Sequence, residues 1–451
     1  MPLPDSFPEP CRPGHPARQM LVQEIRGLAA SPAPWILFVV VSLLVGYSFI
    51  QAVDLFARAS RTARSYPELA AGMNPLDGIF VPTFGAYYLA QTLLLPFVAI
   101  RLIGLDKQSG VLKLLLQLPL SPVLLGGLKI LAMGIVWGIS MIPAGLALIM
   151  WQAQGGHVYY PEIAGLILGH GLYALTVITL AMFAAAITNA LPTAAICCLS
   201  VTLGSWVIDF AAAGHGGLLG ALGGFSLTSR LREFETGLLS LSGGAAFLLP
   251  ALLFFSLTVI WLHPGRRPVV KIGKSLAVTA GLAIGAWIIW AVPGSLDVTE
   301  NHRHSFSVTD TRALGQLSEP LTITVHLDPR DSRLHDLSRD LLGKLRRSVS
   351  DLKIKIVSPA SGGMFQAAED DKYGLIEITC HGKTDQSYSN SAGEILPIIY
   401  HLAGIQVVSE AAPVYPGYPL VTDAAAGGWG FYLLLPLLFA GAGIYSYRGK
   451  W

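Results

Sequence analysis

The sequence predicts a mostly α-helical protein that crosses a membrane several times. Of its 451 residues, 53% are hydrophobic and only 13% are charged, and the mean hydropathy of +0.56 excludes an ordinary soluble domain. About 20 apolar residues in a helix cross the hydrocarbon core of a bilayer. Eight segments approach or exceed that length, at residues 34–53, 84–100, 123–150, 163–187, 190–212, 244–262, 275–293 and 429–446. Residues 54–83 are polar and are expected to connect the first two spans.

The distribution of basic residues predicts the orientation of these spans. With the N-terminus in the cytoplasm, thirteen basic residues fall in or beside the cytoplasmic connections, namely Arg12, Arg18, Arg26, Arg101, Lys107, Lys113, Lys129, Arg266, Arg267, Lys271, Lys274, Arg448 and Lys450. Five fall on the other side, namely Arg58, Arg61, Arg64, Arg230 and Arg232. Short cytoplasmic loops carry the excess of Lys and Arg. We therefore expect a multi-pass protein of the inner (cytoplasmic) cell membrane, with both termini in the cytoplasm and residues 294–428 outside it.

Composition divides the chain into five parts. Residues 1–33 form a cytoplasmic N-terminus with an amphipathic elbow helix at 19–30, and residues 34–263 form a six-span unit. A basic linker and span seven follow at 264–293, then a polar domain at 294–428, then span eight and a cytoplasmic tail at 429–451. Spans seven and eight are expected to form one additional two-span unit that holds the polar domain. Pro143 predicts a kink or tilt in span three.

Alternating apolar residues predict that the polar domain has an α/β fold. Residues 321–327, 352–357 and 375–379 have the period of β-strands, with 405–408 as a further candidate. Residues 332–350 and 391–403 are candidate helices, and the first of them places a stripe of leucines on one face, at Leu334, Leu337, Leu341, Leu342 and Leu345. The β-α-β-β-α order predicts a small two-layer domain, with a thioredoxin-like layout as one candidate. Cys380 is expected in its core as a small apolar residue.

Residues 105–121, between spans two and three, have the pattern of a short amphipathic helix at a water interface. Apolar residues recur there at i, i+3, i+4 and i+7, namely Val111, Leu114, Leu115 and Leu118. Gly110 can begin this helix and Pro119 can end it. A membrane protein driven by a separate soluble motor needs such a segment, because force reaches the bilayer only through backbone that leaves it. The alternative is an amphipathic loop that only rests on the lipid surface.

This segment resembles the loop of the ABC-2 family of ATP-driven permeases, which usually has an acidic and a basic residue, Ser-Gly-Thr, a Leu-rich turn, Pro and Ser. It departs from that pattern at Val111, where the family usually has Thr, and at Lys113, where Glu is common. The resemblance implies a coupling site for an ATP-binding cassette ATPase, formed by Asp106, Lys107, Ser109, Gly110, Val111, Leu114, Leu115, Leu118 and Pro119. A Lys near the position of Lys129 is also common in the family, and we expect this side chain to snorkel to the cytoplasmic interface.

Two further segments carry a resemblance. Residues 227–241, between spans five and six, are similar to the corresponding segment of ABC-2 permeases, with a polar re-entry loop as the alternative. Residues 297–326 resemble the start of the extracytoplasmic protein of gliding-motility ABC transporters, through Asp297, Thr299, Glu300, Asn301, Ser305, Ser307, Glu319 and Pro320. That family begins and ends with one span. The resemblance therefore implies an ABC-2 permease fused to a shortened extracytoplasmic partner.

The sequence lacks the common motifs of catalysis and cofactor binding. Gly273-Lys274-Ser275 and Gly382-Lys383-Thr384 both lack the first glycine of a phosphate-binding loop. The chain contains neither the His-Glu-x-x-His pattern of a zinc site nor a Gly-x-Ser-x-Gly nucleophile elbow. His302 and His304 beside Glu300 suggest a metal site, but solvated or hydrogen-bonded histidines are the favoured interpretation. We predict no catalytic, cofactor or metal residue, and ATP hydrolysis on a separate chain.

Two ionisable residues fall inside predicted spans, where such residues are suspected of function. His170 lies between two glycines in span four, and Asp209 lies near the outer end of span five. For His170 a hydrogen bond between helices is favoured over a substrate contact. For Asp209 an interfacial position with access to water is favoured.

These observations lead to two hypotheses of function. The first is the permease of a transporter, an exporter, that works as a homodimer or with a paired permease in the lipid bilayer. The second is a non-transporting assembly in which the ATPase moves the outer domain to act on envelope or surface machinery. A membrane-bound enzyme has little support because no catalytic constellation is present. A nucleic-acid partner has none, since the formal net charge is only +2.

Overall fold

The computed structural model describes residues 16–117, 121–212, 220, 222–263, 265–292, 294–317, 319–328, 331–349, 351–357, 372–407 and 415–448. Within these ranges the chain is mostly helical and has eight helices that are long and apolar enough to cross a membrane, as the sequence predicts. They are α2 (Pro32–Ala63), η1 with α4 (Leu76–Phe80 and Val81–Gln108), α6 with α7 (Pro122–Ser140 and Ile142–Ala153), α8 (Tyr160–Ile187), α9 (Leu191–Ala212), α12 (Leu241–Leu262), α13 (Pro268–Ala291), and η4 to α18 (Ala425–Arg448).

The first two spans are longer than predicted. The polar stretch after residue 53 continues α2 to Ala63, and an ion pair of 2.7 Å between Asp54 and Arg58, one helical turn apart, lies on this extension. Only residues 64–75, with the short helix α3 (Pro67–Ala70), connect α2 to η1. Span three breaks between Ser140 and Ile142, directly before Pro143, because proline has no N–H to continue the helical hydrogen bonds. The predicted kink is confirmed.

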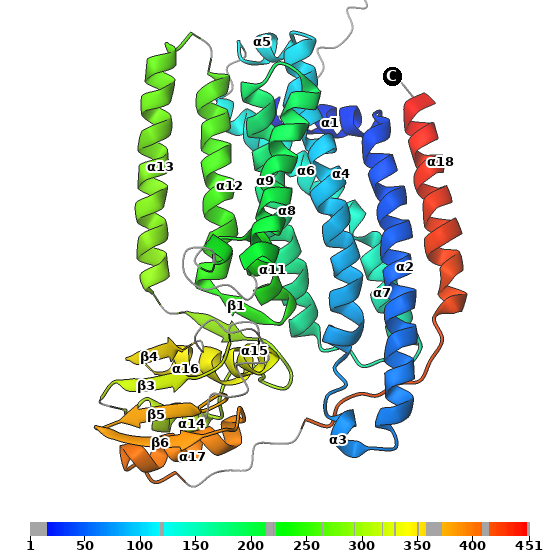
Figure 1. The fold of residues 1–451 in the computed structure, drawn as a ribbon. Helices are drawn as coiled ribbons and strands as arrows, with labels where there is room; N and C mark the ends of the chain where they lie inside the picture. The colour runs from blue at the N-terminus through cyan, green and yellow to red at the C-terminus, as the bar shows by residue number, and fades with distance from the viewer. Residues whose placement is uncertain are drawn as a thin grey trace, which may run out of the picture.

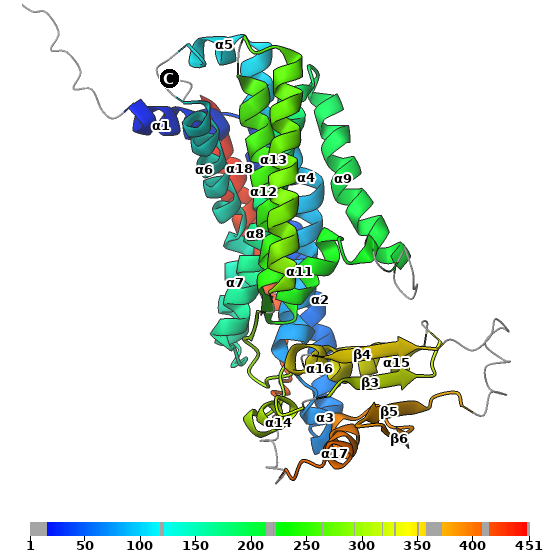
Figure 2. The same cartoon turned by 90° about the vertical axis from the view of Figure 1, so that its left-hand side faces the viewer.

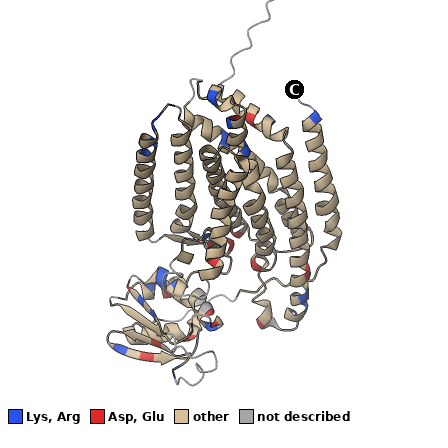
Figure 3. Ribbon diagram, turned by 45° about the horizontal axis from the view of Figure 1, so that its top comes forward, with Lys and Arg blue, Asp and Glu red and all other residues tan. Residues whose placement is uncertain are grey.

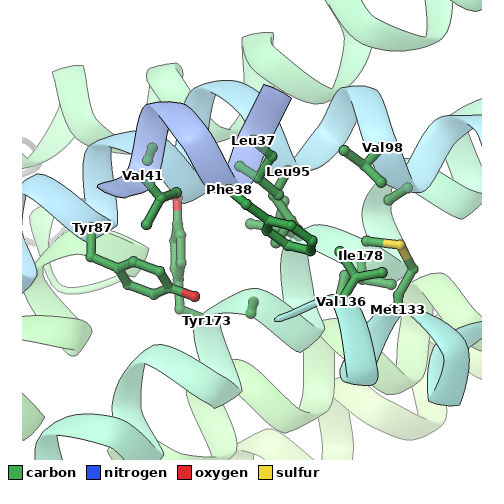
Figure 4. Close-up of a cluster of buried hydrophobic side chains, with 14 of the residues drawn as sticks. Leu37, Phe38, Val41, Tyr87, Leu95, Val98, Met133, Val136, Tyr173 and Ile178 are labelled. Atoms are coloured by element: carbon green, nitrogen blue, oxygen red, sulfur yellow. The ribbon is translucent and has the colours of Figure 1, made fainter. Parts of the chain in front are cut away.

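The spans form a bundle with α8 near its centre (Figure 1). α8 packs against α4, α6, α9 and α12, while α2 packs against α4. Figure 4 shows part of the core that α2, α4, α6 and α8 share; its labelled side chains are Leu37, Phe38, Val41, Tyr87, Leu95, Val98, Met133, Val136, Tyr173 and Ile178. Every one of these side chains is at most 6% exposed. The burial of these apolar side chains joins the four helices into one unit.

Spans seven and eight lie on opposite sides of this bundle (Figure 1). α13 packs against α12 and has no buried residue, whereas α18 packs against α2. The prediction of one two-span unit is therefore wrong. Its physical reason is the path of the chain, which leaves α13, forms the α/β domain and then crosses beneath the bundle before α18 begins.

The described residues of the α/β domain include a four-stranded sheet in the order β4-β3-β5-β6. β3 (Leu321–Val325) pairs in parallel with β4 (Leu352–Ile356) and antiparallel with β5 (Ile376–Cys380), which pairs antiparallel with β6 (Lys383–Ser387). The helices are α14 (Val308–Leu314), α15 (Ser332–Leu337), η2 (Ser338–Leu342), α16 (Gly343–Ser348) and α17 (Ala392–Ala403). The three predicted strands and two predicted helical regions are thus present. Sequence reasoning missed α14 and β6, and residues 405–407 of the fourth predicted strand are not a strand, while residue 408 lies outside the described residues.

The core of this domain confirms the predicted leucine stripe. Leu334, Leu337, Leu341, Leu342 and Leu345 are all at most 6% exposed and pack with the alternate residues of β3 and β5. Cys380 is 1% exposed in the same cluster, as expected of a small apolar residue.

The bundle has two distinct ends (Figures 1 and 2). The short helices α1 (Pro16–Ala29) and α5 (Val111–Leu115) lie at one end with the C-terminal end of α18, and we call it the α5 end. The α/β domain lies at the opposite end, the α/β end.

Candidate coupling site

The predicted coupling segment is a short helix that projects from the α5 end. α4 ends at Gln108, and Gly110 has a φ of 78°, a left-handed conformation that glycine adopts without the steric cost of a side chain. Gly110 is the N-cap of α5, as predicted. α5 ends at Leu115, with Leu116 as its C-cap. Leu118 and Pro119, predicted to complete the helix, lie outside the described residues.

The exposed side of α5 carries apolar side chains. Leu114 is 65% exposed and Val111 is 37% exposed, and Lys113 between them is exposed too. Leu112, which the spacing did not single out, is 7% exposed and belongs to the bundle core, while Leu115 is half-buried against it. Leu112 therefore anchors α5, while Val111 and Leu114 remain exposed.

A cluster of charged residues around Lys129 lies at the end of α4, directly before α5. The Lys129 ammonium donates to Asp106 Oδ2 at 2.7 Å, Glu24 Oε1 at 2.5 Å and the carbonyl oxygen of Leu102 at 2.8 Å. Only 1% of the Lys129 side chain is exposed, so the expected snorkelling to the interface is wrong. The two carboxylates supply the negative charge that a buried ammonium needs. The cluster joins α1, α4 and α6.

Glu24 contributes to this cluster from α1, outside the spans. Burial raises the pKa of Glu24 above its ordinary value, and the opposing effect of the Lys129 ammonium does not cancel that rise. Its side chain is 15% exposed, because Met20 and Leu28 hold the elbow helix against the bundle core. The elbow helix is thus joined to the end of α4, directly before α5, a contact that its amphipathic pattern alone does not reveal.

Lys107 connects the last turn of α4 to α8 through hydrogen bonds. Its ammonium donates to the carbonyl oxygens of Ala186 at 2.9 Å and Thr188 at 2.6 Å, at the C-terminal end of α8. This end of a helix carries partial negative charge, which favours a cation there. Ser109 donates to the carbonyl oxygen of Leu105 at 2.9 Å and so caps its own helix end. Asp106 and Lys107 therefore connect the end of α4, directly before α5, to three other helices, α1, α6 and α8.

His170 and Asp209 lie away from α5, and both meet α11 (Leu227–Glu235), the helix between spans five and six. His170 is fully buried, with Nε2 3.4 Å from Glu235 Oε1. Neither ring nitrogen makes a hydrogen bond to any described residue, so the predicted hydrogen bond is replaced by a looser polar contact. Asp209 accepts from the Arg232 guanidinium at 2.8 Å. The structure thus brings both predicted residues to one helix.

α11 packs closely against α8 at Gly169. A Cβ atom on Gly169 would lie 2.5 Å from Cβ of Phe234, which is closer than such atoms approach. Glycine therefore permits the contact that places Glu235 beside His170. The rings of Phe84 and Tyr87 complete the surroundings of His170, with centroids at 5.1 and 5.8 Å.

A second polar region joins the bundle to the α/β domain. β1 (Leu238–Ser240), just after α11, pairs antiparallel with β2 (Ser295–Asp297), just after α13. Asp297 accepts from the backbone N–H and hydroxyl of Thr299, at 3.0 and 2.5 Å, and from His304 N–H and Ser305 Oγ, both at 2.9 Å. Burial alone would raise the pKa of Asp297, but these hydrogen bonds hold it below its ordinary value. We call the turn 297–305 with its partners the joint.

Glu300 connects the joint to three further segments. Its backbone N–H donates to Glu162 Oε1 at 3.0 Å, and its carboxylate lies 2.9 Å from His157 Nε2 and accepts from Tyr418 Oη at 2.7 Å. The bond to Glu300 raises the pKa of Tyr418 to about 12. The His157 ring stacks on Tyr418 with 3.6 Å between centroids. In the same turn, Arg303 forms an ion pair with Asp77 of η1.

The two histidines considered as metal ligands have other roles or none. His304 is 9% exposed, and its Nε2 lies 2.8 Å from the carbonyl oxygen of Thr236. His302 has a positive φ of 47° at the turn. Among the described residues, no group of three or more His, Cys, Asp or Glu side chains has the arrangement of a metal site.

The segment between the α/β domain and span eight is also hydrogen-bonded to the bundle. Tyr418 N–H donates to the carbonyl oxygen of Met73 at 2.9 Å, and Leu420 N–H donates to Ser60 Oγ at 3.0 Å. These partners are 345 and 360 residues apart in the chain, so no local pattern in the sequence signals them. Both flanks of the domain are therefore bonded to the bundle.

Comparison with known proteins gives no relative to set beside this geometry. No family model matches the chain, and neither a curated protein nor a solved structure matches it.

Proposed function

We propose that this chain is the permease subunit of an ABC-2 type transporter, an exporter driven by a separate ATP-binding cassette ATPase. The observation that carries the proposal is α5, a short helix with exposed Leu114 and Val111 at the end of the bundle opposite the α/β domain. An apolar surface of this kind on the water side of a membrane protein favours a protein partner.

The proposal includes a route for movement. A force on α5 reaches α4 directly, because α5 follows α4 after a single turn. It reaches α6 and α1 through Lys129, and α8 through Lys107. Since α8 lies near the centre of the bundle, a shift at its end would be passed to α9, α11 and α12, which pack on it.

In this proposal the α5 end faces the cytoplasm of a cell with an inner membrane. Lys and Arg residues gather at that end of the bundle, as Figure 3 shows, which is the bias of cytoplasmic connections. Both termini would then be cytoplasmic and the α/β domain extracytoplasmic. A complete transporter would require a second permease, either another copy or a paired chain, and the ATPase subunits would hydrolyse ATP.

A second candidate function is transmission of force to the α/β domain without transport, as in a gliding-type assembly. The joint favours it, because β1–β2, Glu300 and Arg303 couple the domain to α11, α8 and η1. A domain bonded on both flanks would follow movements of the bundle. Transport through paired bundles and force transmission share the same ATPase, so both depend on α5.

Photocrosslinking from α5 tests the proposal. A photoreactive residue at Leu114, in the native membrane, should crosslink to a protein with a phosphate-binding loop, identified by mass spectrometry. The same residue at Leu276, an exposed position on α13, is the matched control and should not capture that protein. If the Leu114 position captures no nucleotide-binding protein while the chain purifies folded, the proposed function is wrong.

A further inference from the structure

A groove opens between spans one and eight at the α5 end. The two helices touch through Phe49 and Phe431, with ring centroids at 5.8 Å, and through Phe38 and Phe439 at 5.3 Å. Ser42 donates to the carbonyl oxygen of Phe431 at 2.7 Å, deep in the same contact. Beyond these contacts, α2 and α18 line an open groove of about 570 Å³. That volume lies within the range of small-molecule sites, roughly 300–1,000 Å³.

The lining of the groove is apolar along most of its length. Ile36 and Val39 of α2 face Ala440 and Ile444 of α18 across it. From Ala440 to Arg448, α18 rises by about 12 Å at about 1.5 Å per residue. This length is close to the ~15 Å depth of one hydrocarbon leaflet. The groove therefore has the dimensions and chemistry to hold part of an acyl chain.

The α5 end of the groove is positively charged. Arg448, which ends α18, is exposed and lines its mouth. Pro32, the first residue of α2, lines it as well, and the first turn of that 32-residue helix contains no acidic residue. Pro32 and Pro34 have no backbone N–H and the N–H of Ala33 donates to Ser31 Oγ, so the Arg448 guanidinium supplies the charge at this mouth. An anion at this mouth would meet that guanidinium.

A close contact fixes the shape of the groove. A Cβ atom on Gly443 would lie 2.8 Å from Cγ of Trp35, so the indole packs directly on the glycine. The Trp35 Nε1 donates to the carbonyl oxygen of Ala29 at 2.8 Å, which holds the ring at the end of α1. Trp side chains with one polar end favour the level of the lipid headgroups. The mouth of the groove thus lies at headgroup depth.

We propose that this groove binds an anionic phospholipid of the bilayer leaflet at the α5 end. The lipid phosphate binds at Arg448, and one acyl chain lies between α2 and α18. This site does not depend on the proposed function, because neither span eight nor Arg448 belongs to the coupling site. The apolar length of the groove selects a lipid over free phosphate.

Native mass spectrometry of the purified full chain tests the site. The chain is equilibrated in micelles that contain equal amounts of phosphatidylglycerol and phosphatidylcholine, and the lipid retained is identified. Wild type should retain phosphatidylglycerol preferentially. Arg448→Gln should lower that preference about fivefold, the effect of one basic residue near the headgroups. Lys274→Gln removes an exposed cation from the start of α13, away from the groove, and should leave the preference unchanged.

A second pair of variants tests the acyl chain. Ala440→Trp fills the groove from an exposed position and should abolish retention of the tightly bound lipid, whereas Ala277→Trp, exposed on α13, should not. Millimolar inorganic phosphate should not displace the lipid. Unchanged retention in both Arg448→Gln and Ala440→Trp would overturn the proposal, and so would displacement by phosphate. A loss of dimers in Ala440→Trp without loss of lipid would instead identify the groove as a contact between copies.

Discussion

Lys129 donates to the Asp106 carboxylate over 2.7 Å although only 1% of its side chain is exposed. The same ammonium binds Glu24 of α1, so three helices meet at one buried charge. A buried charge without partners costs several kcal/mol, which makes this arrangement resistant to separation. The Lys129 ammonium therefore connects the end of α4, directly before α5, to α1 and α6.

Removal of the lysine should destabilise the bundle. In Lys129→Met, the Glu24 and Asp106 carboxylates lose the cation between them while remaining 15% and 25% exposed. Breaking a buried pair in this way costs about 3 kcal/mol or more. Thermal unfolding in detergent should show a lowered Tm.

The compensated variant is the control for that experiment. Glu24→Gln and Asp106→Asn, added to Lys129→Met, remove both orphaned charges and should recover a large part of the lost Tm. A single Lys129→Met as stable as wild type would show that the cluster does not hold the helices together.

Gly169 should tolerate no side chain. Its Cβ position lies 2.5 Å from Cβ of Phe234, so Gly169→Ala must displace α11 and is expected to cost about 1–3 kcal/mol. Gly134→Ala on α6 is the matched control, because nothing lies within 4 Å of its Cβ position and alanine favours the helix. Tm values of the two variants check this, and equal effects would exclude tight packing at Gly169.

The sequence predicts well those features that repeat locally. The eight spans follow from runs of apolar residues, the break in span three from Pro143, and the start of α5 from Gly110. The leucine stripe of residues 332–350 follows from helical spacing. In each of them, the deciding interaction joins residues that are neighbours in the chain.

Features that depend on distant residues could not be predicted in this way. Lys129 and Glu24, which form a hydrogen bond, are 105 residues apart in the chain. Glu300 and Glu162, which also form one, are 138 residues apart. The strand β6 is polar and exposed in its first four residues, so it has no alternation that would reveal it. The separation of α13 from α18 likewise depends on contacts with α12 and α2.

The joint should weaken in acid. The pKa of Asp297 is below its ordinary value of 3.8, so the stability that its carboxylate contributes is present above that value and is lost as pH falls through the lowered pKa. Asp297→Asn should lose about 1–3 kcal/mol at neutral pH, because an amide oxygen cannot replace both carboxylate oxygens. Unfolding measured from neutral pH down through the lowered pKa should show a wild-type decline that the variant lacks. The same decline in both proteins would assign the acid sensitivity to another group.

The proposed orientation predicts which residues an impermeant thiol reagent reaches. In a Cys380→Ala background, a cysteine at Gln386, exposed on β6, should be labelled in intact cells whose outer barrier admits the reagent. A cysteine at Lys113, exposed on α5, should be labelled only after lysis. Labelling in the opposite order would place the α5 end outside.

The central claim is that α5 binds an ATPase, and one substitution tests it most directly. Leu114→Asp places a charge on a side chain that is 65% exposed in the free chain, so the bundle should fold and insert normally. In a contact with the ATPase the charge would be buried without a partner, at a cost of about 3 kcal/mol or more. That cost weakens binding by about a hundredfold or more. Lys113→Ala on the same helix is the control.

The measurement is the amount of ATPase that co-purifies with each variant from native membranes. We expect Leu114→Asp to reach normal levels in the membrane without the ATPase, and Lys113→Ala to retain the ATPase. Undiminished ATPase in the Leu114→Asp preparation would contradict this expectation.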